Sequence, residues 1–189
     1  KKVYYDDLLE RAVSKFVPAD DLVVPYSATS LNDAEAIIQT IKISENELRK
    51  QQVSGFYSDV DLGPPGNIKQ DDVEKKEKEL DGTKKTGRQE PIYNLLECHV
   101  NLDLEGFEDK DAELNPTGIK LPYIVTVDEG SKKVLSIRRN YQPTDPKRNK
   151  IQYFVHFKFL PGLGFYGFGL IHMIGGLSRT ATAALRQLL

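Results

Sequence analysis

The chain has 189 residues, of which 39% are hydrophobic and 29% charged, as expected for a soluble globular protein large enough for one domain and an appendage. Its single cysteine, Cys98, excludes a disulfide framework and a zinc site built from several cysteines. The net charge of -2 hides an asymmetry, because residues 132–189 hold ten Lys and Arg against Asp145 and carry +9, which leaves -11 on residues 1–131. This split suggests two halves that attract each other, charges neutralised within the fold, or two surfaces with different partners.

The first part of the chain carries short strand signals and then a longer one. Residues 16–26 contain two apolar runs around a turn, and their two prolines are typical of a sheet edge. Residues 30–33 are a plausible helix start. Residues 36–43 are rich in β-branched side chains, which favours a strand.

A capping box predicts the first helix. Ser44 and Glu47 have the spacing at which the serine hydroxyl accepts the glutamate amide while the glutamate side chain returns to the serine. The helix should run to about Ser54 and end at Gly55, which can take the left-handed conformation.

A charged segment follows a break of glycine and proline. Residues 67–80 predict a surface helix with too few apolar positions for deep burial, and residues 81–90 predict a loop. Residues 67–90 are therefore expected to form an excursion from the domain.

The next part of the chain predicts a meander of about four strands. Strands are expected over residues 92–104, 119–127 and 133–141, with Gly130 at the positive-φ position of the turn between the last two. Residues 151–160 alternate apolar and polar side chains, which predicts a strand with one buried and one partly wet face. The order of elements gives an α+β fold, a mixed or antiparallel sheet with flanking helices.

The end of the chain predicts a helix. Apolar residues recur there at steps of three and four and form one stripe: Leu170, Ile174, Leu177, Ala181, Leu185 and Leu188. Arg179 and Arg186 are seven residues apart, so a helix places them within about 20° of each other and apart from this stripe. Residues 180–189 hold no stop signal and the chain lacks a first Met, so we expect the sequence to continue in both directions in a parent protein.

The sequence gives no strong signal for a metal site. Four oxygen-bearing side chains alternate as in a calcium loop: Asp109, Asp111, Glu113 and Asn115. The required glycine is replaced by Leu114 and the bidentate glutamate by Lys120, so a solvated hairpin tip is predicted instead. His99, His156 and His172 lie on separate predicted elements.

Catalytic and nucleotide-binding patterns are also weak. Cys98 and His99 point to opposite faces of a strand and cannot form a nucleophile–base pair. The glycines between Gly162 and Gly169 resemble a phosphate loop, but Phe165, Tyr166 and Phe168 would crowd a pyrophosphate. The sequence therefore predicts no enzyme and assigns no catalytic, metal or cofactor-binding residue.

A membrane span is not predicted either. The uncharged run over residues 159–178 contains a proline, a histidine and six glycines, which would make a poor helix in lipid.

The segment YFVHFKFLPGLGFYGFGLIHMIGGL, residues 153–177, is the most specific feature of the sequence. This glycine–aromatic segment resembles portal proteins of tailed bacteriophages, in particular those of short-tailed phages and related prophages. Residues 16–26, 47–57 and 116–127 are similar to the same family, so the resemblance extends over nearly the whole chain.

The resemblance implies a structural subunit of the head-to-tail connector, an oligomeric ring at one capsid vertex of the virion. Such a ring is dodecameric, and double-stranded DNA passes through its channel during packaging and ejection. Its partners are further copies of itself, terminase, capsid or scaffold proteins and tail adaptors, without a membrane or a cofactor. It assembles in the cytoplasm of the bacterial host.

The resemblance also implies a domain division. Residues 1–165 would form the wing-like α+β domain, and residues 166–189 would begin a long helix toward the stem. Arg179 and Arg186 are then candidates to face DNA or a neighbouring subunit. The alternative is a stand-alone nucleic-acid-binding module that uses the basic C-terminal third.

Overall fold

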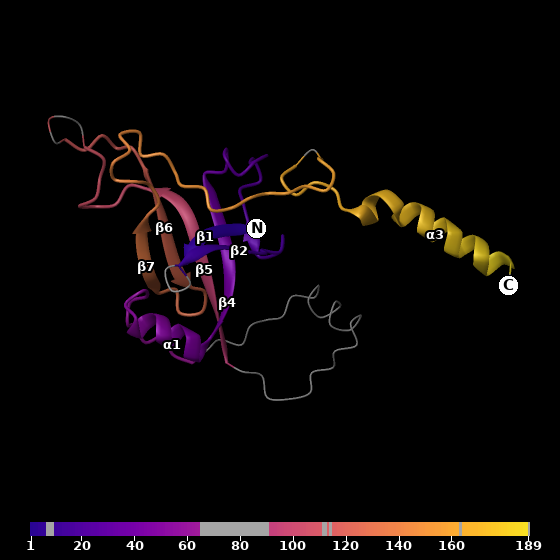
Figure 1. Ribbon diagram of the computed structural model, residues 1–189, viewed down its shortest axis with the longest axis horizontal. Helices are drawn as coiled ribbons and strands as arrows, with labels where there is room; N and C mark the ends of the chain where they lie inside the picture. Colours follow the sequence, from indigo (N-terminus) through magenta and orange to yellow (C-terminus); the bar gives the residue numbers. More distant parts are fainter. Residues whose placement is uncertain (7–9, 65–90, 111–112, 114, 163, 189) are drawn as a thin grey trace. The chain divides into compact units, whose positions relative to one another are not determined.

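The computed structural model describes residues 1–6, 10–64, 91–110, 113, 115–162 and 164–188 (Figure 1). The excursion predicted over residues 67–90 lies outside the described residues. Within them the elements follow in the order β1 (Lys2–Asp6), β2 (Arg11–Lys15), β3 (Leu22–Val23), β4 (Ala36–Ser44), α1 (Glu45–Val53), β5 (Ile92–Leu102), β6 (Leu121–Asp128), β7 (Val134–Arg139) and α3 (Leu170–Leu188).

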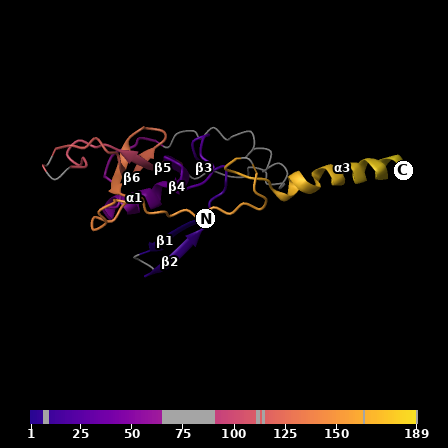
Figure 2. The same ribbon diagram turned by 90° about the horizontal axis from the view of Figure 1, so that it is seen from above.

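The strands form two antiparallel sheets, which confirms the predicted α+β class. One is the two-stranded ribbon β1–β2, labelled in Figure 2, and the other has the strand order β3-β4-β5-β6-β7. The chain divides into two compact units, one of Lys1–Ile37 with Lys150–Leu189 and one of Ile38–Asn149. Each unit contains its own hydrophobic cluster.

The second unit is built on the meander β5–β6–β7. Alternate residues of β5, from Tyr93 through Leu95 and Glu97 to His99, are buried on one face of the sheet. The helix α1 begins as predicted, since the Ser44 hydroxyl accepts the Glu47 amide at 3.3 Å. Its core joins strands, helix and the following loop through Ile43, Leu48, Tyr57, Tyr93, Leu95 and Leu135.

The β6–β7 hairpin forms where it was predicted, but its strained residue differs. The left-handed position is Lys132, with φ 59°, whereas Gly130 has no positive φ. The turn is organised by Asp128, whose carboxylate accepts the Ser131 amide at 2.7 Å and whose carbonyl accepts the Lys132 amide at 2.9 Å. This side-chain bond draws Lys132, not Gly130, into the left-handed region.

The first unit contains a turn where a helix start was expected. The Asp33 carboxylate accepts hydrogen bonds from the backbone amides of Thr29 and Ser30 at 3.0 and 2.8 Å. Residues 30–33 therefore form a turn, and no helix follows. The Lys150 ammonium donates to the carbonyls of Leu31 and Ala34 and fixes this turn to residue 150. The two strand pieces expected over residues 16–26 reduce to β3 alone.

Residues 151–160 do not form the predicted strand. They are extended, but the only pairings among the described residues are isolated bridges from Phe154 to Lys2 and from Leu160 to Phe168. A strand needs a partner along its length, and here β1 supplies one only near residue 154.

Candidate interaction surface

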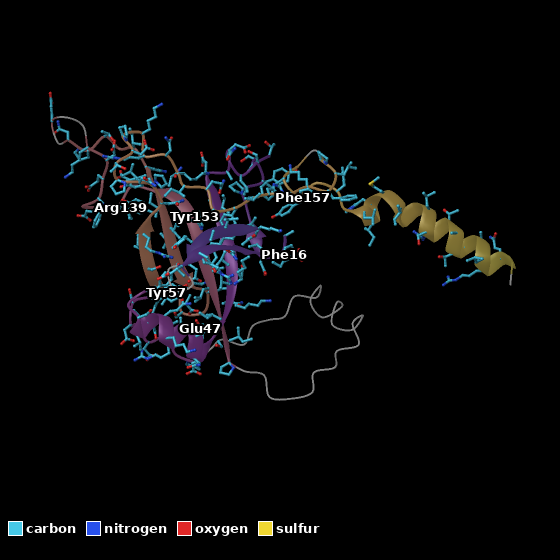
Figure 3. All side chains as sticks on the ribbon, in the orientation of Figure 1. Phe16, Glu47, Tyr57, Arg139, Tyr153 and Phe157 are labelled. Atoms are coloured by element: carbon cyan, nitrogen blue, oxygen red, sulfur yellow. The ribbon has the colours of Figure 1, made fainter. Side chains whose placement is uncertain are left out.

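The extended segment 151–160 turns its apolar side chains outward. Val155, Phe157 and Phe159 are 58%, 85% and 59% exposed, whereas Phe154 is buried in the core of its unit. Val155, Phe157 and Phe159, which belong to the apolar face of the alternating pattern, are therefore exposed to solvent. Tyr153 and Phe157 are labelled in Figure 3, which shows the side chains along this segment.

The backbone of the same segment is partly unpaired. Val3 and Val155 donate to the carbonyls of Tyr153 and Lys1, both at 2.7 Å, which ties the start of the segment to β1. Beyond this point, residues 156–159 bond to no other backbone group in the described part of the chain. Exposed apolar side chains beside unpaired backbone groups are typical of an edge that another chain covers.

The glycines that follow make a tight reversal. Leu160 and Phe168 exchange backbone hydrogen bonds at 3.2 and 2.9 Å. Gly167 has φ 67°, and a Cβ there would lie 2.8 Å from the Leu160 carbonyl oxygen. A Cβ at Gly162 would lie 2.9 Å from the Phe168 ring. These two glycines therefore serve close packing of the chain against itself.

Aromatic and basic groups anchor the reversal to its unit. His156 stacks on buried Phe165 with ring centroids 4.2 Å apart, and burial, together with the charges of Lys158 and the amino terminus, lowers the pKa of this histidine. The Lys158 ammonium donates to the carbonyls of Thr29 and Gly164. His156 and Lys158 therefore face inward, while Val155, Phe157 and Phe159 face solvent.

The helix α3 is exposed on all sides. Leu170, Ile174, Leu177 and Leu185 are 54%, 47%, 73% and 64% exposed, so the predicted stripe is uncovered among the described residues. Arg179 and Arg186 are exposed too, and the helical repeat places them nearly opposite the stripe. A shallow hollow along α3 is lined by Ile174, Gly175, Ser178 and both arginines, all from this one helix, so it is a groove on the helix surface.

No family model matches the chain, and no curated protein sequence does.

The remaining candidate residues do not come together. The His99 ring lies 2.7 Å from the Glu97 carboxylate inside the second unit, and Cys98 is half-buried on the other face of β5. The Asp109 carboxylate forms an ion pair with Arg148 and accepts the Thr117 hydroxyl, while Asp111 and Leu114 lie outside the described residues. No group of three or more His, Cys, Asp or Glu side chains that could hold a metal ion occurs in the described ranges.

None of the described helices is both long and apolar enough to cross a membrane.

The basic residues of the C-terminal third are mostly engaged within the chain. Four have their charged groups on oxygen atoms of the same chain: Lys133, Arg148, Lys150 and Lys158. Two lie over aromatic rings, Arg138 on Phe56 and Arg139 on Phe107. The other four, Lys132, Lys147, Arg179 and Arg186, are divided equally between the two units. In the described part of residues 132–189, each unit therefore holds only two basic residues without such a contact.

The outward direction of residues 155, 157 and 159 was not predicted from the sequence. A signal was present in the glycines that follow the segment. They turn the chain back after residue 160, and this leaves the segment little length for pairing with a strand. The alternating pattern alone is equally consistent with a core strand and with an edge that awaits a second chain.

Proposed function

We propose that this chain is part of a subunit of a bacteriophage portal, the ring at a capsid vertex through which DNA enters and leaves. The subunit would be structural and not catalytic. It would contact neighbouring copies in a dodecamer, the passing double-stranded DNA, terminase, capsid or scaffold proteins and tail adaptors. Its place would be the virion, after assembly in the bacterial cytoplasm. The resemblance of residues 153–177 to this family supports the proposal.

The observation that carries the proposal is the apolar surface of the glycine–aromatic segment and α3. Phe157, Ile171 and Leu177 are each more than 70% exposed, at 85%, 78% and 73%. Large apolar side chains in such numbers mark surfaces that bind other proteins. A head-to-tail ring covers different faces of each subunit with its two neighbours, which suits an exposed segment followed by an exposed helix.

The alternative of a stand-alone nucleic-acid-binding module receives less support. A binding face for phosphates needs several free cationic groups close together. Of the ten basic residues in residues 132–189, four have their charged groups bonded to oxygen atoms of the same chain, as described above.

The proposal is tested with the full-length protein that contains these residues. Negative-stain electron microscopy and native mass spectrometry should show a closed ring of identical subunits. Leu177→Glu places a charge on the apolar stripe and should prevent closure, whereas Ala183→Glu, on the other side of α3, should not. A full-length protein that stays monomeric, or a Leu177→Glu protein that closes like the wild type, would overturn the proposal.

A further inference from the structure

The strand β7 is an outer strand of the five-stranded sheet, and part of its outer edge is open (Figure 1). The Asn140 amide donates to the Pro122 carbonyl at 2.9 Å, and in the same register Arg138 faces Ile124. Hydrogen-bonded pairs alternate along an antiparallel ladder, so the backbone groups of Ile137 and Arg139 point away from β6.

Only the beginning of this edge is covered. The Ser58 amide donates to the Leu135 carbonyl at 2.8 Å. No described backbone group bonds to the outward N–H or C=O of Ile137 or Arg139. The Ile137 side chain is 50% exposed. Beyond Leu135 the edge therefore offers two residues with donor and acceptor in the spacing that an added strand requires.

The open edge is strongly basic. Lys132, Arg138 and Arg139 stand in or beside β7, whereas the Lys133 ammonium donates to the Asp61 carbonyl, and the sequence has no acidic residue between Glu129 and Asp145. The guanidinium carbon atom of Arg138 lies 4.2 Å from the centroid of the Phe56 ring, and that of Arg139 lies 5.9 Å from the centroid of the Phe107 ring. Stacking on a ring leaves the guanidinium N–H groups at its rim able to donate to carboxylates.

We infer that the open edge of β7 binds an extended acidic peptide by strand addition. The edge of a second copy would bring like charges opposite each other, which destabilises a strand pair. A nucleic acid would satisfy the arginines, but its phosphates carry no donor for the outward carbonyls of Ile137 and Arg139. A peptide with carboxylates on alternate residues matches the backbone and brings its charges to one of the two arginines, which point to opposite faces of the sheet. This inference does not rest on the portal proposal.

The test uses the 189-residue chain and two blocked, fluorescein-labelled peptides, one alternating glutamate with valine and one alternating lysine with valine. Fluorescence anisotropy at low ionic strength should show the acidic peptide binding at least about tenfold more tightly. Ile137→Pro removes an outward N–H without touching the ladder to β6, and it should weaken binding of the acidic peptide about tenfold. Ile137→Val should bind like the wild type.

Two further measurements keep the test decisive if the proline variant does not fold. Arg139→Glu should shift the preference toward the lysine peptide. An acidic peptide methylated on alternate backbone nitrogens should bind about tenfold more weakly than its unmethylated parent, because it cannot donate to the edge. Equal binding of the two peptides would overturn the inference, as would full binding by the methylated peptide. Tighter binding of a single-stranded oligonucleotide that a folded Ile137→Pro variant leaves unchanged would show a phosphate site instead.

Discussion

At the scale of single residues, Glu97 and His99 form a buried polar pair in the core of the second unit. Their side chains are 8% and 3% exposed, and the carboxylate lies 2.7 Å from the ring nitrogen. Glu97→Ala leaves the histidine buried without this hydrogen-bond partner and should lower the free energy of unfolding by roughly 1–3 kcal/mol. Glu97→Gln keeps an acceptor oxygen and should cost clearly less. Urea denaturation of both variants measures the difference, and equal losses would show that the contact itself contributes little.

Asp33 predicts a pH dependence. Hydrogen bonds from the Ser30 side chain, then from the backbone and side chain of Thr29, hold the pKa of its carboxyl well below the ordinary value. A lowered pKa in the folded state stabilises the fold above the unfolded pKa of about 4, and this contribution is lost as the pH falls toward the folded pKa. Asp33→Asn should therefore be less stable than the wild type at pH 7, and the gap should narrow below about pH 4.

Urea midpoints at a series of pH values measure this gap. Asp20→Asn changes an exposed aspartate of the same unit for which no hydrogen bond is found in the described part, and its midpoints should stay parallel to those of the wild type. A gap between Asp33→Asn and the wild type that is constant from pH 7 to the acid range would contradict the role given to the carboxylate.

At the scale of elements, the hairpin offers a direct contrast between glycines. Gly130 has no positive φ, and a Cβ there would meet only the Asp128 carboxylate at 3.4 Å, so Gly130→Ala should change stability by less than about 1 kcal/mol. Gly55, which ends α1 with φ 78°, should lose about 1–2 kcal/mol on the same change. Thermal melts of both variants make the comparison. A larger loss at position 130 than at position 55 would restore the original expectation for the turn.

Elements that depend on local chemistry could be predicted from the sequence. The capping box fixed the start of α1, and the strand signals with a turn between them located β6 and β7. The sequence could not tell whether Lys132 or Gly130 takes the left-handed position, because the hydrogen bond that the Asp128 carboxylate accepts from the Ser131 amide decides it. It also could not tell which face of residues 151–160 is buried, because that depends on which strand lies beside them.

At the scale of the whole molecule, the exposed apolar surfaces of residues 155–159 and of α3 say most about function. The helical repeat was enough to place Arg179 and Arg186 together and away from the stripe, and α3 spans both positions as expected. The sequence could not show that the stripe is left open, since apolar spacing looks the same in a core helix. A chain with a core in each unit and apolar side chains left outside suits a component that is completed by neighbouring subunits.

The two arginines give a prediction that rests on the portal proposal. They lie nearly opposite the apolar stripe, so a ring that packs through the stripe would leave them for DNA or for another surface of the next subunit. In the full-length protein, Arg179→Ala combined with Arg186→Ala should preserve ring closure and reduce genome packaging. Binding of DNA in a channel is sequence-blind and electrostatic. The salt dependence of DNA binding by the ring should therefore also weaken, by about one unit of slope for each phosphate that the ring no longer neutralises.

Gln187→Ala, an uncharged change on the same helix, is the matched control. Wild-type packaging and an unchanged salt slope in the double variant would exclude a role for this charged face, whereas a failure of ring closure would place the arginines at the contact between subunits.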